Sequence, residues 1–137
     1  MNWEKSCGAI VFTRQNGQIL YVIVEENTGP YSFPKGQMEG NETEMETARR
    51  EVFEEIGLRP TFLEGFYQQD EYPLSEKPGT WKRVTYFLAE FRNEPLIAQQ
   101  SEIRKILLLP WDQATPLFKH ENTRRILKAA HAFLTQD

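Results

Sequence analysis

Residues 36–58 constrain the fold of this chain more than any other segment. The spacing of apolar residues predicts a helix over 44–56. Its apolar stripe consists of Met45, Ala48, Val52 and Ile56. Gly57 follows where the end of a helix favours a left-handed residue, so we expect the helix to stop there. Gly36 opens the preceding loop, where the lack of a side chain lets the backbone approach a ligand closely.

Three carboxylates gather on this predicted helix. Glu51 precedes Glu54 by three residues and Glu55 by four, and side chains at those spacings are neighbours on a helix surface. Their repulsion costs stability, and Arg50 alone cannot neutralise three negative charges. Clustered hard oxygen ligands suit Mg²⁺, with Mn²⁺ as an alternative, because these ions keep waters that a phosphate can displace. A solvated acidic face is the plainer interpretation, but it does not explain the fixed positions of the glycines and the arginine.

The complete pattern reads glycine, five residues, glutamate, seven residues, then Arg-Glu-aliphatic-any-Glu-Glu-any-Gly-aliphatic. The positions that fill it are Gly36, Glu42, Arg50, Glu51, Val52, Glu54, Glu55, Gly57 and Leu58. This pattern resembles the Nudix box, the signature of hydrolases that cleave a nucleoside diphosphate linked to another group. A non-catalytic Nudix domain that senses a nucleotide is the alternative from another class. Such binders commonly lose a catalytic glutamate, and this chain keeps all three.

The resemblance also implies roles for single residues. It assigns metal binding to Glu51, Glu54 and Glu55, assisted by a backbone carbonyl near Lys35 or Gly36. Arg50 would orient Glu51 through an ion pair, and Glu42 would support it electrostatically. Glu102 precedes a late apolar segment where family members often carry another carboxylate, which binds metal or acts as general base. A solvated loop residue is the alternative for Glu102, and the pattern leaves Glu39 and Glu44 free.

Segments outside the box resemble the asymmetric diadenosine tetraphosphate hydrolase branch, which gives ATP and AMP. They are residues 6–12, 33–36, 40–43 and 82–90. Gln37 stands where this branch often has His, and Trp81 matches nothing in its pattern. The alternatives within the enzyme class are a nucleoside triphosphate pyrophosphatase, an RNA 5′-pyrophosphohydrolase and a diphosphoinositol phosphate hydrolase.

A dinucleoside tetraphosphate needs cations for its phosphates and flat side chains for its bases. Lys35 and Lys82 are the cations that this resemblance places near the acidic site, and each would act as a point charge on phosphate oxygens. Aromatic stacking under a base contributes on the order of 1–3 kcal/mol. The aromatic candidates are Tyr31, Tyr72, Tyr86 and His120. For Tyr86, which lies in an apolar segment, a core position is the alternative.

Composition limits the remaining possibilities. A chain of 137 residues fits one domain, which we place at 1–137, and its net charge of −4 argues against a general nucleic-acid binder. Cys7 is the single cysteine, so no intramolecular disulfide forms, and its apolar setting predicts a packing role. The first residues lack the apolar stretch of a signal peptide, and no run is long enough to span a membrane, so we expect a cytoplasmic enzyme. Oligomeric state is not set by the sequence.

Strand-like segments lie on both sides of the predicted helix. They cover residues 7–13, 18–24, 61–68, 82–91 and 103–109. Asn16-Gly17 is a hairpin signal between the first two, and a closing amphipathic helix is predicted over 123–134 with Ile126, Leu127, Ala130 and Leu134 inward. These elements predict an α/β protein, an α/β/α sandwich with a mixed sheet between helices. The Nudix fold implied by the resemblance has the same architecture.

Overall fold

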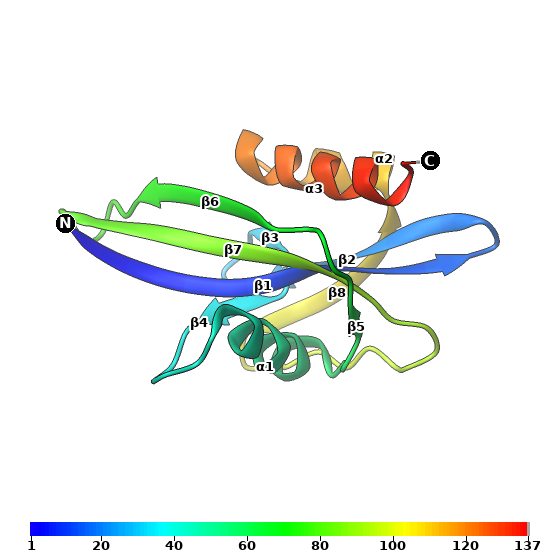
Figure 1. Ribbon diagram of the computed structural model, residues 1–137, viewed down its shortest axis with the longest axis horizontal. Coiled ribbons are helices and arrows are strands. Elements are labelled where there is room, and N and C mark those ends of the chain that lie inside the picture. The colour runs from blue at the N-terminus through cyan, green and yellow to red at the C-terminus, as the bar shows by residue number, and fades with distance from the viewer. Residues whose placement is uncertain (137) are drawn as a thin grey trace.

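The computed structural model describes residues 1–136 as one mixed sheet with helices on both faces (Figure 1). The strands are β1 (Asn2–Gln15), β2 (Gln18–Glu26), β3 (Tyr31–Ser32), β4 (Lys35–Gln37), β5 (Thr61–Phe62), β6 (Gln68–Pro73), β7 (Thr80–Glu90) and β8 (Ile103–Pro110). The helices are α1 (Glu44–Ile56), α2 (Trp111–Ala114), a 3₁₀ turn (Thr115–Leu117) and α3 (Glu121–Leu134). The predicted α/β/α architecture is confirmed.

The sheet is built around β1. It pairs in parallel with β7 on one edge, and on the other edge it pairs antiparallel with β2 and then with β4. The β1–β2 turn carries Asn16 at φ 52° and Gly17 at φ 77°, as the Asn-Gly signal predicts for a type I′ hairpin. Because β4 joins the same edge of β1 that β2 leaves, the chain entering α1 is held against the middle of the sheet.

The strand predicted over 61–68 is wrong as a single element. β5 ends at Phe62 and pairs with the end of β7, whereas β6 begins at Gln68 and pairs with the first half of β7. Gly65 lies between them at φ 93°, a conformation that breaks an extended strand. The two pieces therefore pair with different parts of one long neighbour.

Each face of the sheet has its own core. Under α3, the buried residues include Ile10, Phe12, Tyr21, Phe33, Tyr86, Ile126, Leu127 and Ala130. Under α1, they include Ala9, Val11, Val22, Val24, Val52, Ile56 and Leu58. The predicted inward residues of α3 are confirmed, with Leu134 partly buried at the end of that cluster. On α1 the stripe is buried at Ala48, Val52 and Ile56, and Met45 is only half-buried.

Local sequence fixes both ends of α1. Thr43 and Glu46 form a reciprocal capping box at the start of the helix. At its end Gly57 is left-handed, with φ 75°, and donates its backbone N–H to the carbonyl of Phe53. None of the helices in residues 1–136 is long and apolar enough to cross a membrane.

Candidate active site

The backbone of β4 lies directly against the face of α1 that carries Glu51 and Glu55. A Cβ atom added to Gly36 would lie within 3.0 Å of the carboxyl carbon and both carboxyl oxygens of Glu51. Only glycine fits there, and because Gly36 pairs with Cys7 of β1, the strand cannot move aside freely. The close backbone approach expected at Gly36 is confirmed, although its partner in this structure is the Glu51 carboxylate.

Arg50 binds many more carboxylates than the predicted pairing with Glu51. Its guanidinium donates to Glu51 at 2.9 Å and to both carboxyl oxygens of Glu54 at 3.2 and 3.3 Å. It also contacts Glu42 at 2.6 Å and Glu39 at 3.3 Å. One cation therefore lies among four carboxylates, which leaves the group strongly negative.

Glu42 is the best satisfied of these acids. Besides Arg50, it accepts hydrogen bonds from the backbone of Glu39 and from the hydroxyl of Thr47, both at 2.9 Å. Its bond to Arg50, aided by these donors, lowers the pKa of Glu42 to about 2. Glu42 thus stays ionised and fixes the Arg50 guanidinium, which agrees with its predicted supporting role.

The environment of Glu55, unlike that of Glu42, disfavours the ionised carboxylate. Its side chain is buried, with 7% exposed, and one oxygen accepts the backbone N–H of Lys35 at 3.3 Å. Burial raises the pKa of Glu55 to about 8, a rise that Lys35 only partly offsets. Burial also raises the pKa of Glu51, against the effect of Arg50. These two predicted ligands therefore carry a cost of ionisation that a nearby cation would reduce.

Glu102 lies within electrostatic range of this cluster. Its negative charge contributes to the raised pKa values of both Glu51 and Glu55. Its backbone carbonyl accepts from Asn27 at 2.9 Å, and its amide donates to Gln99 at 3.0 Å. The side chain is exposed. The fold therefore brings Glu102 towards the predicted ligands, and its role as base or ligand stays a prediction.

Two lysines, Lys35 and Lys82, place positive charge near the carboxylates. The Lys35 ammonium favours ionisation of Glu55, and it also disfavours the charged form of Lys82. Burial is the larger cause of the lowered pKa of Lys82, and the like charge of Lys35 is the second. Tyr72 lies directly opposite Lys82 in the β6–β7 register. The two predicted cations therefore lie within electrostatic range of each other, and Lys35 lies beside the acidic cluster.

The aromatic candidates separate into two groups. Tyr86 is 5% exposed and packs edge to face on Phe33, so the structure favours its core interpretation over base stacking. Tyr72 is 37% exposed. His120 is exposed and precedes α3, whose Asn122 donates to Asp70 of β6 at 2.9 Å, two residues from Tyr72. Tyr31 in β3 is half-buried at the edge of the α3-side core.

Two acids, Glu44 and Glu39, make contacts that the sequence pattern did not single out. Glu44, at the first position of α1, accepts the hydroxyls of Tyr67 and Thr85, each at 2.8 Å. These bonds attach the start of the helix to β7 through Thr85 and to the segment before β6 through Tyr67. Glu39 pairs with Arg50 as described above. An acid in the first turn of a helix, such as Glu44, signals only a favourable dipole interaction, and Glu39 lies in the loop before α1, so the partners of neither acid could be found without the fold.

The carboxylates supply hard oxygen atoms, the ligand type that divalent cations prefer. Within residues 1–136, no three His, Cys, Asp or Glu side chains already converge closely enough to hold a metal ion. Arg50 explains this, because it pulls Glu51 and Glu54 towards itself while Glu55 faces Lys35. Excess negative charge and raised pKa values at Glu51 and Glu55 fit a cation. The donor set therefore suits a divalent metal that draws these side chains together.

Comparisons with known proteins agree with this site. The NUDIX domain family matches residues 4–130. The chain is 31% identical over 142 residues to asymmetrical bis(5′-nucleosyl)-tetraphosphatase of Sus scrofa, and 31% identical over 144 residues to that of Rattus norvegicus, with 95% of each chain covered in both cases. The chain belongs to the Nudix family. The enzyme class predicted from the box, a Nudix hydrolase, is therefore confirmed.

A solved structure shows the same fold over the whole length. The crystal structure of a C. elegans Ap4A hydrolase binary complex has a TM-score of 0.90 and 21% identity, covering 98% of this chain and 99% of that one. Nudix hydrolases generally use divalent metal ions, in keeping with the donor set around α1.

Proposed function

We propose that this Nudix hydrolase cleaves diadenosine tetraphosphate asymmetrically into ATP and AMP, with Mg²⁺ as its metal and Mn²⁺ as a substitute. The observation that carries the proposal is the continuous series from the acidic cluster through Lys35 to Lys82 and the exposed Tyr72. Its similarity over 95% of the chain to proteins named asymmetrical bis(5′-nucleosyl)-tetraphosphatase supports the choice of substrate. The cytoplasmic location stays a prediction.

The two lysines favour a long anionic chain. Holding Lys35 and Lys82 close together in a half-buried setting costs free energy, as the lowered pKa of Lys82 indicates. A tetraphosphate, with about four negative charges, would offset that repulsion along its length. Tyr72 and His120 then lie beyond the phosphates as the candidates for an adenine, with Tyr31 at the inner edge.

The carboxylates divide the chemistry among themselves. Glu51, Glu54 and Glu55 would hold the metal, with the backbone near Gly36, and the metal would neutralise charge on the phosphate oxygens. Arg50 orients Glu51 and Glu54 through its hydrogen bonds. We assign to Glu102 the general base that takes a proton from the attacking water, with metal binding as its alternative role.

Product analysis tests the substrate and the bond that is cleaved. In oxygen-18 water, attack on the phosphate four positions from the bound adenosine places the label in AMP, while the bridging oxygen leaves with ATP. We expect ATP plus AMP, with label in AMP alone. Two ADP molecules as products would refute the proposal. Faster turnover of nucleoside triphosphates or 5′-triphosphorylated RNA in the same panel would favour the alternative hydrolases.

Two variants test the assigned residues. Lys82→Ala should weaken binding of diadenosine tetraphosphate more than binding of a dinucleoside diphosphate, by about tenfold or more. A charge-assisted hydrogen bond contributes on the order of 1.5–3 kcal/mol. An equal loss for both substrates would place Lys82 away from the polyphosphate. Glu102→Gln should lower the rate and change the ascending limb of the pH profile if Glu102 is the base, whereas partial recovery at high metal would identify a ligand.

A further inference from the structure

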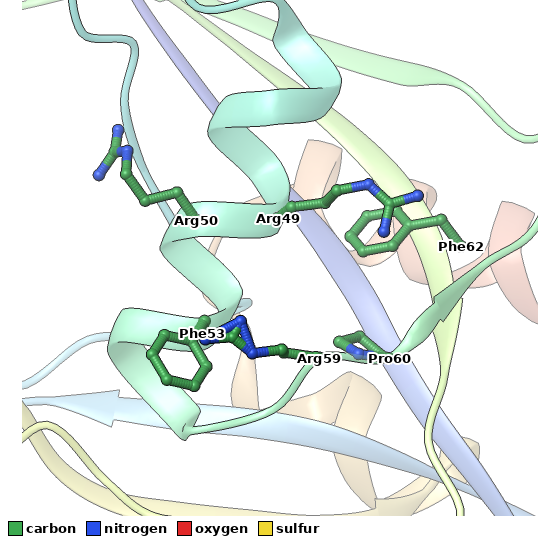
Figure 2. Close-up of a pocket in the computed structure, with 6 residues that line it drawn as sticks. All are labelled: Arg49, Arg50, Phe53, Arg59, Pro60 and Phe62. Carbon is green, nitrogen blue, oxygen red and sulfur yellow. The ribbon is translucent and has the colours of Figure 1, made fainter.

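A hollow of about 410 Å³ opens beside α1, on the side towards β5 (Figure 2). The residues that line it are Arg49, Arg50, Phe53, Arg59, Pro60 and Phe62. Arg50 also lines the hollow, but its guanidinium points away from those of Arg49 and Arg59 and binds the acidic cluster (Figure 2). The hollow is therefore distinct from the hydrolytic site.

Two arginines in this hollow lie over aromatic rings. The Arg49 guanidinium lies 4.6 Å from the ring centre of Phe62, and that of Arg59 lies 4.0 Å from the ring centre of Phe53. A cation–π contact of this kind favours one position of the guanidinium and leaves its N–H groups able to donate to another acceptor. Both cations are thus preorganised for an acceptor.

Neither arginine has an acidic partner in the part of the chain that the structure describes. The acid one helical turn before Arg49 is Glu46, and its carboxylate is engaged by the capping box with Thr43. The chain as a whole carries a net charge of −4, so two unpaired cations facing one hollow are a local exception. Such a site attracts an anion rather than a cation or a neutral group.

The same hollow offers a flat apolar surface. Phe53 is 42% exposed although it is a large aromatic residue on a helix, and the buried Pro60 forms the floor beside it. Aromatic rings and guanidinium planes are the surfaces on which nucleobases stack. The volume lies within the range of about 300–1,000 Å³ that is typical of small-molecule sites.

We propose that this hollow is a second nucleotide site, which takes a purine mononucleotide and does not take part in hydrolysis. The phosphate accepts hydrogen bonds from Arg49 and Arg59, and the base packs against Phe53 and the outer face of the Arg59 guanidinium. This inference does not depend on which nucleotide the hydrolytic site cleaves.

Amide chemical shifts of the full-length, isotopically labelled protein test the site. AMP, inorganic phosphate and adenosine are titrated separately into the metal-free protein, and shifts are followed at Phe53 and Phe62 and, for the hydrolytic site, at Lys35 and Lys82. We expect saturable shifts in both sets with AMP, and binding at Phe53 and Phe62 at least about tenfold tighter for AMP than for inorganic phosphate or adenosine. Equal affinity for inorganic phosphate and AMP at the hollow would overturn the nucleotide assignment.

Variants separate the two sites. The double variant Arg49→Ala with Arg59→Ala should weaken AMP binding at the hollow about tenfold or more. It should keep the AMP-induced chemical shifts near Lys82 and the basal rate of hydrolysis. Lys82→Ala should keep AMP binding at the hollow and weaken AMP binding at the hydrolytic site. A double variant that binds AMP at the hollow like the parent would refute the second site and leave the proposed hydrolase function intact.

Charge and shape are separated by two more variants. Arg49→Lys with Arg59→Lys keeps both positive charges and removes the flat fork, so AMP binding at the hollow should still weaken. Unchanged binding would show that the guanidinium planes are not used. Lys128→Ala, an exposed charge on α3 across the sheet, is the control for the loss of one positive charge and should leave AMP binding unaltered.

Discussion

Gly36→Ala tests whether close packing of β4 on α1 positions the Glu51 carboxylate. The added methyl group would lie within 3.0 Å of all three atoms of that carboxyl group, whereas non-bonded carbon atoms normally rest roughly 3.5–4.0 Å apart. Since Gly36 is held by its pairing with Cys7, the side chain of Glu51 has to yield. To restore a normal separation, we expect the carboxylate to move by roughly 1.5 Å.

The size of the effect follows from that displacement. A misplacement of about 1 Å in a reacting group costs on the order of a hundredfold in rate, and metal–ligand distances tolerate only about 0.2 Å. A hundredfold loss corresponds to about 2.7 kcal/mol at 1.36 kcal/mol per decade. We therefore expect Gly36→Ala to lower kcat/KM about a hundredfold at limiting metal, while the fold is retained.

The measurement combines turnover as a function of metal concentration with direct metal titration by calorimetry. Gly40→Ala is the control, because it lies in the same loop and its added Cβ meets no atom within 4 Å. Its φ of 53° makes the change locally strained, so the control reports backbone strain without a collision with Glu51. Parental metal affinity and turnover in Gly36→Ala would show that the position of Glu51 does not limit the reaction.

Three further substitutions address stability and ionisation. In metal-free protein, Glu55→Gln should remove a fall in stability as pH rises from about 4.5 to about 8, because the native pKa of Glu55 lies above its unfolded value; thermal melts across that range measure the slope. Glu42→Gln should reduce the loss of stability that occurs as pH falls from about 4.5 to about 2, because Arg50 depresses the pKa of Glu42. Acid titration followed by circular dichroism measures this loss. Ile56→Ala, at a fully buried position, should lower the free energy of unfolding in urea by about 2–5 kcal/mol.

The sequence predicts the features that depend on local chemistry. The bounds of α1, the left-handed Gly57 and the Asn16-Gly17 turn follow from capping, glycine conformation and periodicity, and all three are confirmed. Periodicity could not separate β5 from β6, because the break at Gly65 is set by which part of β7 each piece reaches. Strand pairing is a property of the folded chain.

The same division holds for the site. Spacing alone places Glu51, Glu54 and Glu55 together, because one helix carries them. The proximity of Lys35 to Lys82 depends on β4 and β7 both flanking β1, so it required the fold. Besides Glu54 on α1 itself, the extra partners of Arg50 come from the loop before α1, where the pattern specifies Glu42 but leaves Glu39 free. The core position of Tyr86 likewise follows from α3 covering its face of the sheet.

The contrast among the acids explains how α1 tolerates so much like charge. Glu42 sits where ionisation is favoured, as its depressed pKa shows, and it holds the Arg50 guanidinium in place. Glu51 and Glu55 sit where burial opposes ionisation, so their repulsion is reduced at the cost of part of their charge. Burial of Val52 and Ile56 on the other side of the helix stabilises α1 independently of these charges. A divalent cation binding among Glu51, Glu54 and Glu55 favours their ionised forms, so its affinity should rise with pH until Glu55 is fully ionised, at a pH above its metal-free pKa of about 8.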